Sequence, residues 1–303
     1  MTTLADKASL AELPARAGFG ALLMLASAII ASTLGLSVRL IDTAGGWQII
    51  FYRSLSMVLA VLLYLAFRHR GRLAAHLMSA GWTGIVGGAC MAAATTFGVW
   101  AFLHTTIANV LFIGGTVPFF AGLLGWLVLG ERVRKVTWLA MAIAFAGIVV
   151  MTGGGLAQGN YIGDLLALGA MVCFAGLVVA MRSGRLQDMT PLLVIGMAFA
   201  TLTAALSLPT FAISLHDLVV CIVMGAVQSF VAYIMFMIAA RHLRAGEMSL
   251  LGVSETIFGP LWVWLAVNEV PANATFVGGA VILVAVFAQG VATLRAERSA
   301  GTP

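Results

Sequence analysis

The sequence predicts an all-α, polytopic membrane protein whose ten transmembrane helices form two inverted five-helix repeats. Three observations support this prediction: long apolar runs without charge, an uneven distribution of Lys and Arg between alternate loops, and an internal repeat. Of the 303 residues 62% are hydrophobic and only 9% are charged, with a mean hydropathy of +1.07. This composition excludes the soluble, disordered and coiled-coil classes.

The apolar runs define the individual helices. Residues 73–130 contain no Asp, Glu, Lys or Arg. A bilayer core about 30 Å thick needs roughly 20 apolar residues per helix. The first run is longer than a signal-peptide core and lacks a clear cleavage site, so we expect a retained helix. The expected spans are residues 17–38, 47–67, 79–102, 107–129, 136–152, 161–181, 190–213, 217–240, 248–267 and 273–294.

Short loops rich in Gly, Pro or Asn are expected between these helices, for example at residues 42–46, 153–160 and 268–273. Ten helices place alternate loops on opposite sides of the membrane. The loops on the side away from the termini contain a single basic residue, Arg39, and Arg53 lies inside the second helix. By the positive-inside rule both termini, with tails 1–16 and 295–303, are predicted to be cytoplasmic. The basic residues on that side are Lys7, Arg16, Arg68, Arg70, Arg72, Arg132, Arg134, Lys135, Arg182, Arg185, Arg241, Arg244, Arg295 and Arg298.

An internal repeat appears when the sequence is shifted by 138 residues. Residues 115–131 (GTVPFFAGLLGWLVLGE) then align without gaps with residues 253–269 (VSETIFGPLWVWLAVNE), so that Trp126 matches Trp264 and Glu131 matches Glu269. The shift carries helix four onto helix nine. Helix nine comes five helices after helix four, and because five is an odd number the two halves must face opposite ways. Inverted repeats of this kind place a binding site near the bilayer midplane and permit alternating access.

Three motifs carry a family resemblance: IIFYRSLSMVLA at residues 49–60, VPFFAGLLGWLVLGE at 117–131 and SETIFGPLWVWLAVNE at 254–269. They resemble the drug/metabolite transporter superfamily, in its ten-helix branch with two EamA-like repeats, here residues 17–152 and 161–294. The resemblance implies a multi-pass protein of the bacterial inner membrane.

The same resemblance implies a secondary transporter that exports amino acids, including aromatic or hydrophobic ones. The alternatives are an importer of a vitamin or other metabolite and a drug-efflux carrier. The chain departs from the family pattern at Thr256, where proline is usual and is delayed to Pro260, and at Asn268, where glycine is usual.

Arg53 and Glu255 are the two ionisable residues expected well inside the membrane. A charge there costs several kcal/mol unless it is paired or hydrated, which makes each a candidate for function. The two side chains could pair with each other as a structural bridge. Alternatively, each could contact one end of a zwitterionic substrate, and Glu255 could carry a coupling proton.

Neutral polar and aromatic residues complete the expected substrate site. Trp100 could form a cavity wall or anchor a helix at the membrane interface. Asn109, Gln228, Tyr233 and Thr33 could bind substrate through hydrogen bonds or join helices to one another. Further expectations are that Pro118 and Pro260 break helices four and nine, that Asp164 is a carboxylate at a helix N-terminus, and that Glu131 and Glu269 end their helices without touching substrate.

No catalytic set is present in the sequence. It lacks a GK[ST] phosphate loop, a His-Glu-x-x-His zinc motif and a Gly-x-Ser-x-Gly nucleophile motif. Cys90, Cys173 and Cys221 lie in apolar runs and are expected to pack as small apolar residues. We therefore expect no enzyme activity, no metal, no cofactor and no nucleic-acid partner. The expected partners are a small-molecule substrate and the lipid bilayer, with the chain as a monomer or homodimer.

Overall fold

The structure is a computed structural model that describes residues 4–69, 77–131, 133, 135–158, 161–184, 190–240, 242–243 and 245–300. Within these residues all regular secondary structure is helical. Several basic loop residues used for the predicted topology lie outside the described residues: Arg70, Arg72, Arg132, Arg134, Arg185, Arg241 and Arg244.

The helices of the two halves follow the predicted spans. The first half contains α1 (Leu4–Ser32), α2 (Leu34–Arg39), α3 (Gly46–His69), α5 (Gly81–His104), α6 (Ile107–Gly114), α7 (Val117–Leu129) and α8 (Lys135–Gln158). The second contains α9 (Tyr161–Ser183), α10 (Thr190–Ser207), α11 (Leu215–Ile222), the π-helix η1 (Val223–Ser229), α12 (Phe230–Ala239), α13 (Ala245–Val267) and α14 (Asn273–Ala300). In the described residues nine helices are long and apolar enough to cross a membrane, or ten when α6 and α7 count as one bent span. This confirms the predicted all-α membrane fold.

Two predicted boundaries and one predicted helix break are wrong. The loop expected at residues 153–160 is helical as far as Gln158, because glycines weaken a helix without removing its hydrogen bonds. Helix seven ends at Ser207 and not at residue 213, since Pro209 disfavours helical geometry in the residue before it. Pro260 lies inside the continuous helix α13 and does not divide it.

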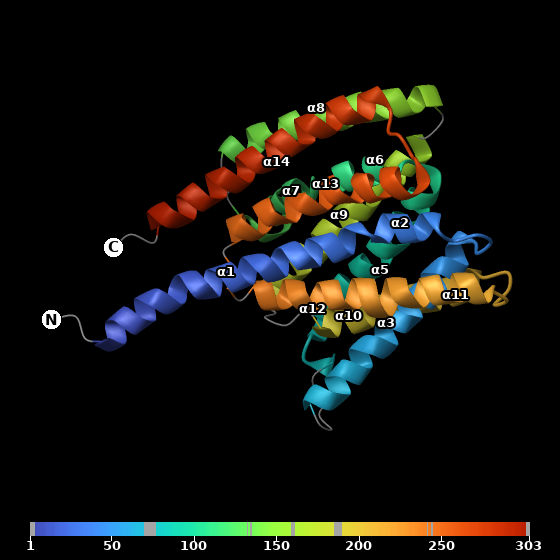
Figure 1. Ribbon diagram of the computed structural model, residues 1–303, viewed down its shortest axis with the longest axis horizontal. Coiled ribbons are helices and arrows are strands. Elements are labelled where there is room, and N and C mark those ends of the chain that lie inside the picture. Colours follow the sequence, from blue (N-terminus) through green and yellow to red (C-terminus); the bar gives the residue numbers. More distant parts are fainter. Residues whose placement is uncertain are drawn as a thin grey trace.

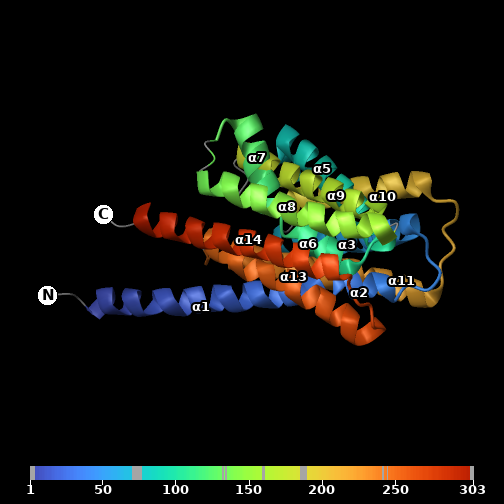
Figure 2. The same ribbon diagram turned by 90° about the horizontal axis from the view of Figure 1, so that it is seen from above.

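The packing follows a two-fold pattern between the halves. Helix α8 packs on α14 and α3 packs on α10, so the fifth and second helices of each half meet their own counterparts (Figures 1 and 2). The contact of α5 with α9 corresponds to that of α12 with α1, and the contact of α7 with α9 corresponds to that of α13 with α1. The two halves therefore form one interlocked bundle.

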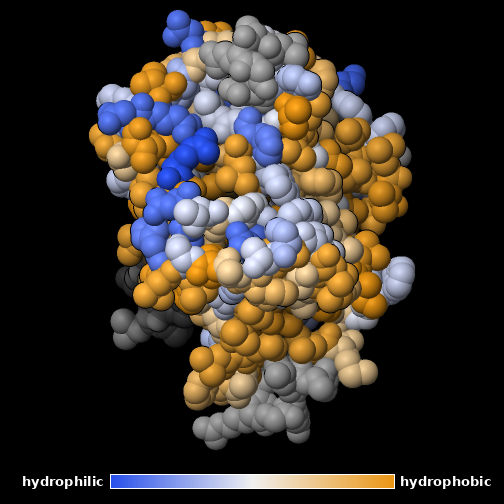
Figure 3. Space-filling model, turned by 90° about the vertical axis from the view of Figure 1, so that its right-hand side faces the viewer, coloured by the Kyte–Doolittle hydropathy of each residue, from blue (hydrophilic) through white to orange (hydrophobic). Residues whose placement is uncertain are grey.

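The matched helices four and nine run in opposite directions. The backbone N–H of Ile107, at the start of α6, donates to Glu269, just beyond the end of α13, at 2.9 Å. Helix α1 begins and α14 ends on one side of the bundle, here called the termini face (Figure 1). The opposite side, here called the distal face, gathers polar side chains that are flanked by hydrophobic ones (Figure 3).

The outer surface and the interior are both apolar, as expected of a bundle in lipid. Large side chains such as Phe67, Phe145 and Leu206 are exposed on the outside. Inside, one cluster of buried residues includes Ile50 and a second includes Met57. Arg53 lies between these two residues on α3, so the chain places a cation between two apolar cores.

Candidate functional site

The first transmembrane span is interrupted at Thr33, between α1 and α2. The hydroxyl of Ser32 donates to the carbonyl of Ile29 at 2.7 Å, and that of Thr33 donates to the carbonyl of Ile30 at 2.6 Å. Hydroxyl groups that bond to the preceding turn compete with regular helix geometry. The interruption brings the hydroxyls of the first span into the middle of the bundle.

The eighth span contains a second irregularity, the π-helix η1. The hydroxyl of Ser229 donates to the carbonyl of Met224, five residues earlier, at 2.7 Å. Gly225 packs directly on the backbone oxygen of Arg53, which leaves no space for a side chain. Single π turns in helices are frequent at functional sites. This one sets α3 and the eighth span close together at the level of Arg53.

Gln228 joins the two irregular segments. Its side-chain amide donates to the hydroxyls of Thr33 at 2.9 Å and Ser37 at 2.7 Å. From the other side, the indole N–H of Trp262 on α13 donates to the hydroxyl of Ser32 at 2.9 Å. The structure thus brings together two predicted site residues, Thr33 and Gln228, that are far apart in sequence.

Arg53 is buried beside this cluster, with only 9% of its surface exposed. One guanidinium nitrogen, Nη2, donates to the hydroxyl of Ser229 at 3.2 Å. The buried Nε has no hydrogen-bond partner in the described part of the chain, and neither has the buried hydroxyl of Tyr233, one turn further along the eighth span. Buried polar groups are normally hydrogen-bonded, and these two are among six buried side-chain atoms without a partner in the described residues.

Glu255 lies on α13 and is half-buried. Its carboxylate makes no hydrogen bond or ion pair within the described residues, and none joins it to Arg53. The structural bridge that the sequence allowed between these residues is therefore absent from this conformation.

Contacts with the first span show the depth of both charges. Gly252 lies against Met24 and Gly259 against Ser32, which places Glu255 near residue 27 of α1. Ser27 bonds to the carbonyl of Ala232, and Gln228 bonds to Thr33, which places Ser229 and hence Arg53 near residue 31. At 1.5 Å per residue the two charges differ in depth by about one helical turn, ~6 Å. Both lie near the middle of the span Gly18–Arg39.

Trp100 lies apart from this cluster. It sits near the end of α5 at the distal face, where its ring contacts Trp47 at 5.7 Å and His104 at 5.5 Å between centroids. In this conformation its surroundings are those of a residue that anchors the helix end.

Asn109 also lies apart, in a buried network near the distal face. Its amide donates to Asp164 at 2.9 Å and to the hydroxyl of Thr105 at 3.1 Å, and its carbonyl accepts from Thr275 at 2.7 Å. Thr105 also donates to Asp164, at 2.8 Å. The bonds of Asn109 to Asp164 and Thr275 link helix α6 to α9 and α14, and the bond of Thr105 to Asp164 ties the segment between α5 and α6 to α9. Asp164 is fully buried at the start of α9, so it is more than the helix-terminal carboxylate that the sequence indicated.

A second anchor of the distal face is Asp217, which is fully buried at the start of α11. Its carboxylate accepts the backbone N–H groups of Asp42, Thr43 and Ala44 at 2.9 to 3.0 Å. Asp217, Asp42 and His216 have potential metal-ligand atoms within 4.8 Å of one another. Because the Asp217 oxygens already accept these backbone donors, their arrangement is that of a loop anchor.

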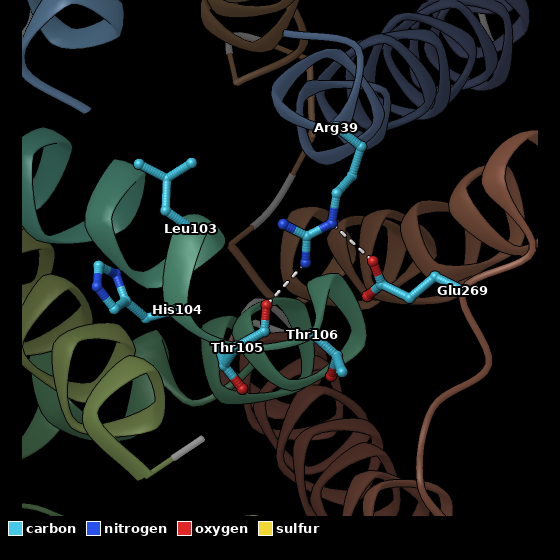
Figure 4. Close-up of a pocket in the computed structure, with 6 residues that line it drawn as sticks. All are labelled: Arg39, Leu103, His104, Thr105, Thr106 and Glu269. Carbon is cyan, nitrogen blue, oxygen red and sulfur yellow. Dashed lines mark hydrogen bonds and ion pairs between the residues drawn. The ribbon is translucent and has the colours of Figure 1, made fainter. Parts of the chain in front are cut away.

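An ion pair lies at the distal face. Arg39, in the last turn of α2, donates from Nε to Glu269 at 2.7 Å and from two other nitrogens to the carbonyls of Phe102 and Thr105. Arg39 and Glu269 line a hollow of about 360 Å³ together with Leu103, His104, Thr105 and Thr106, as drawn in Figure 4. The hollow lies at the rim of the bundle and does not include Arg53 or Glu255.

Sequence reasoning missed Ser37, Ser229 and Arg39. Serines carry little signal in a sequence because they are common in membrane helices, and the π turn has no sequence signature of its own. Arg39 did carry a signal, since it alone occupies a loop on its side of the predicted topology.

The inverted repeats, the broken spans and the central polar cluster together define the class of membrane transporters that bind a solute between two halves. The EamA-like transporter family model matches residues 18–153 and again residues 161–289. The chain therefore belongs to the EamA-like transporter family, and it is a transporter and not an enzyme.

Curated relatives and solved structures agree with this assignment. The pseudopaline exporter CntI from two strains of Pseudomonas aeruginosa is 28% identical over 195 residues, which cover 62% of this chain and 68% of the relative. A solved crystal structure matches 90% of this chain and 97% of its own, with a TM-score of 0.63 and 18% identity. At that identity the match shows the fold alone.

Proposed function

We propose that this transporter exports small amino-acid-like solutes with an apolar, flat side group across the bacterial inner membrane by alternating access. The two halves, residues 17–152 and 161–294, act as the moving units around a central site. One observation carries the proposal: Arg53 and Glu255 are opposite charges, close in depth near the midplane, and neither has an ionic partner in the described residues.

The physical argument rests on the cost of a charge in a bilayer. That cost is several kcal/mol unless the charge is paired or hydrated. Arg53 forms a single bond to a serine hydroxyl and Glu255 forms none within the described residues. A zwitterion would present its carboxylate to the guanidinium and its ammonium to the carboxylate, which would satisfy both. A guanidinium is well suited to a carboxylate because its N–H groups match the two oxygens.

Neutral groups near the two charges support a substrate with an apolar side group. Phe258 and Trp262 stack at 6.1 Å between centroids, with an angle of 19° between their planes. They follow Glu255 on α13 at spacings of three and seven residues, so all three share one helix face. The Tyr233 hydroxyl, which has no partner among the described residues, and the bonded side chains of Gln228 and Thr33 provide further hydrogen-bonding groups near the same depth.

Other observations support the proposed direction of transport and the proposed orientation in the membrane. The relatives at 28% identity are named as exporters, which supports outward transport. The fourteen basic residues on the side of the termini support cytoplasmic N- and C-termini. The distal face would then be periplasmic.

The test is transport into proteoliposomes that contain only this protein, with and without an imposed pH gradient. The panel compares phenylalanine and leucine with their methyl esters, which lack the carboxylate, and their N-acetyl forms, which lack the ammonium. We expect saturable transport of the free amino acids and at least about tenfold weaker competition by either blocked form, a difference of ~1.4 kcal/mol. Equal competition by all three forms would refute recognition by two charges.

The alternative substrate class is a flat, neutral metabolite such as a vitamin, or a drug. The Phe258–Trp262 stack favours it, because aromatic faces bind planar rings without requiring charge. In the same panel, transport of a riboflavin-like ring compound and of no amino acid would favour this alternative. Overproduction that raises tolerance to toxic amino-acid analogues would instead support amino-acid export.

A further inference from the structure

The two halves carry the same pair of charged residues at equivalent places. In the last turn of its first span each half has an arginine, Arg39 or Arg182. Each half also has a glutamate two residues beyond the end of its fourth span, Glu131 after α7 and Glu269 after α13.

The residues just before the two glutamates also correspond. Gly130 and Asn268 both adopt left-handed backbone geometry, with φ of 68° and 53°. Asparagine tolerates this geometry better than other residues with a side chain, so it can replace the glycine that is usual here. The repeat is therefore preserved in local structure as well as in sequence.

The ion pairs cross between the halves. Arg39 of the first half bonds to Glu269 of the second at 2.7 Å, and Arg182 of the second half bonds to Glu131 of the first at 3.0 Å. The first pair lies at the distal face and the second at the termini face. Each pair thus ties the first span of one half to the fourth span of the other, at opposite ends of the bundle.

The two ion pairs differ in burial and in the number of hydrogen bonds that they form. At the distal face the side chains of Arg39 and Glu269 are 24% and 20% exposed, and at the termini face those of Arg182 and Glu131 are 49% and 45% exposed. Arg39 also donates to two backbone carbonyls, and Glu269 also accepts the N–H of Ile107. The termini-face pair has a single mutual bond within the described residues.

The fourth and ninth spans also differ in conformation, although their sequences correspond. The segments α6 and α7 meet at a bend of 42° around residues 115–116. The matching residues, 253–254, lie inside the continuous helix α13. Equivalent sequences in two different conformations are what an inverted-repeat carrier shows in one of its two end states, because the halves exchange roles between states.

We propose that the two crossed pairs are alternating closures of the transport path. The Arg39–Glu269 pair holds the distal face shut in the conformation seen here, and the Arg182–Glu131 pair tightens to close the termini face in the other. In that second state the bend moves from the fourth span to the ninth, near residues 253–254. This inference rests on the proposed alternating access and is independent of the substrate.

The test measures access to the midplane from each side. A reporter cysteine replaces Thr33 in a chain whose native cysteines are changed to alanine, and an impermeant maleimide is applied to right-side-out or inside-out vesicles without substrate. With Glu269→Gln the labelling rate from the distal face should rise, and that from the termini face should fall, each at least about fivefold. With Glu131→Gln both changes should have the opposite sign.

Matched controls separate closure from simple damage. Asp42→Asn removes a 72% exposed carboxylate at the distal face and should leave both labelling rates unchanged. A purely structural role for the pairs predicts that Glu269→Gln and Glu131→Gln change the two rates in the same direction, or not at all, and either result overturns the proposal. If Glu269→Gln fails to insert, Arg39→Lys takes its place, and if Glu131→Gln fails, Arg182→Lys does. Each lysine keeps the charge but loses hydrogen bonds, so it must shift the labelling rates in the direction expected for the glutamate variant that it replaces, by a smaller factor.

The outcome is distinguishable from that of the proposed substrate class. Opposite shifts in labelling together with no transport of any amino acid would support the closures and refute the substrate. Amino-acid transport without opposite shifts in labelling would support the substrate and refute the closures.

Discussion

Replacing Asn109 by leucine should destabilise the protein without removing a substrate contact. Asn109 is 3% exposed, and its side chain makes three hydrogen bonds, two of them to other transmembrane spans. Leucine has a similar size, so the loss is mainly that of the bonds. Asp164 would keep only the donor from Thr105, and the Thr275 hydroxyl would lose its acceptor.

The magnitude follows from the kinds of bond lost. A neutral bond between membrane helices contributes ~0.6 kcal/mol on average, as for Thr275. A bond to a charged group contributes ~1.5–3 kcal/mol, as for Asp164. We therefore expect Asn109→Leu to lower the free energy of unfolding by about 2–4 kcal/mol. Combining it with Thr275→Val should reveal a coupling of ~0.6 kcal/mol and no more than ~1.7 kcal/mol.

The assay is reversible unfolding in mixed detergent micelles, with transport measured per folded molecule in proteoliposomes. Thr201→Val is a matched control, because among the described residues the Thr201 hydroxyl bonds only within its own helix, to the carbonyl of Met197 at 2.8 Å. It should change stability by less than ~0.5 kcal/mol. Wild-type stability of Asn109→Leu with transport abolished would refute the reasoning and would make Asn109 a substrate contact.

Three further predictions follow from the site, the helix ends and the topology. Arg53→Gln and Glu255→Gln should each remain folded and monodisperse in detergent but lose transport. Glu255→Gln should also flatten the pH dependence of any residual exchange. Wild-type transport rates in folded Glu255→Gln would contradict the role of this carboxylate. Asn268→Gly should raise the free energy of unfolding by ~0.4–1 kcal/mol. Asn268→Val should lower it by ~1–2 kcal/mol, because φ of 53° is unfavourable for valine. Equal stabilities of the three proteins in denaturant titrations would show that this backbone geometry carries no strain. A single cysteine at Ala157 should react with an impermeant reagent from the periplasm and one at Arg68 should not; the reverse pattern would overturn the topology.

Much of the fold could be predicted from the sequence alone, because the cost of charge in lipid acts on each segment separately. Charge-free runs of about 20 residues can only span or be buried, so they define the helices without any knowledge of their packing. The repeat of Trp126 and Glu131 at Trp264 and Glu269, combined with an odd helix spacing, determined the inversion. The effect of proline was misjudged twice: the predicted span 190–213 ran past Pro209, although α10 ends at Ser207, and Pro260 lies inside the continuous helix α13.

The partners of the polar residues were decided only by the tertiary structure. From the sequence, Arg53 and Glu255 could either pair with each other or make two separate contacts, and in the structure they do not bond to each other. The sequence made Asn109 and Gln228 equal candidates, yet Asn109 lies in a buried network with Asp164 and Thr275, whereas Gln228 joins two irregular helix segments. Hydropathy and periodicity are local properties, whereas a hydrogen bond requires two atoms from distant segments to meet within about 3 Å. That meeting depends on helix rotation, crossing and local breaks, which follow from the packing of all ten spans together.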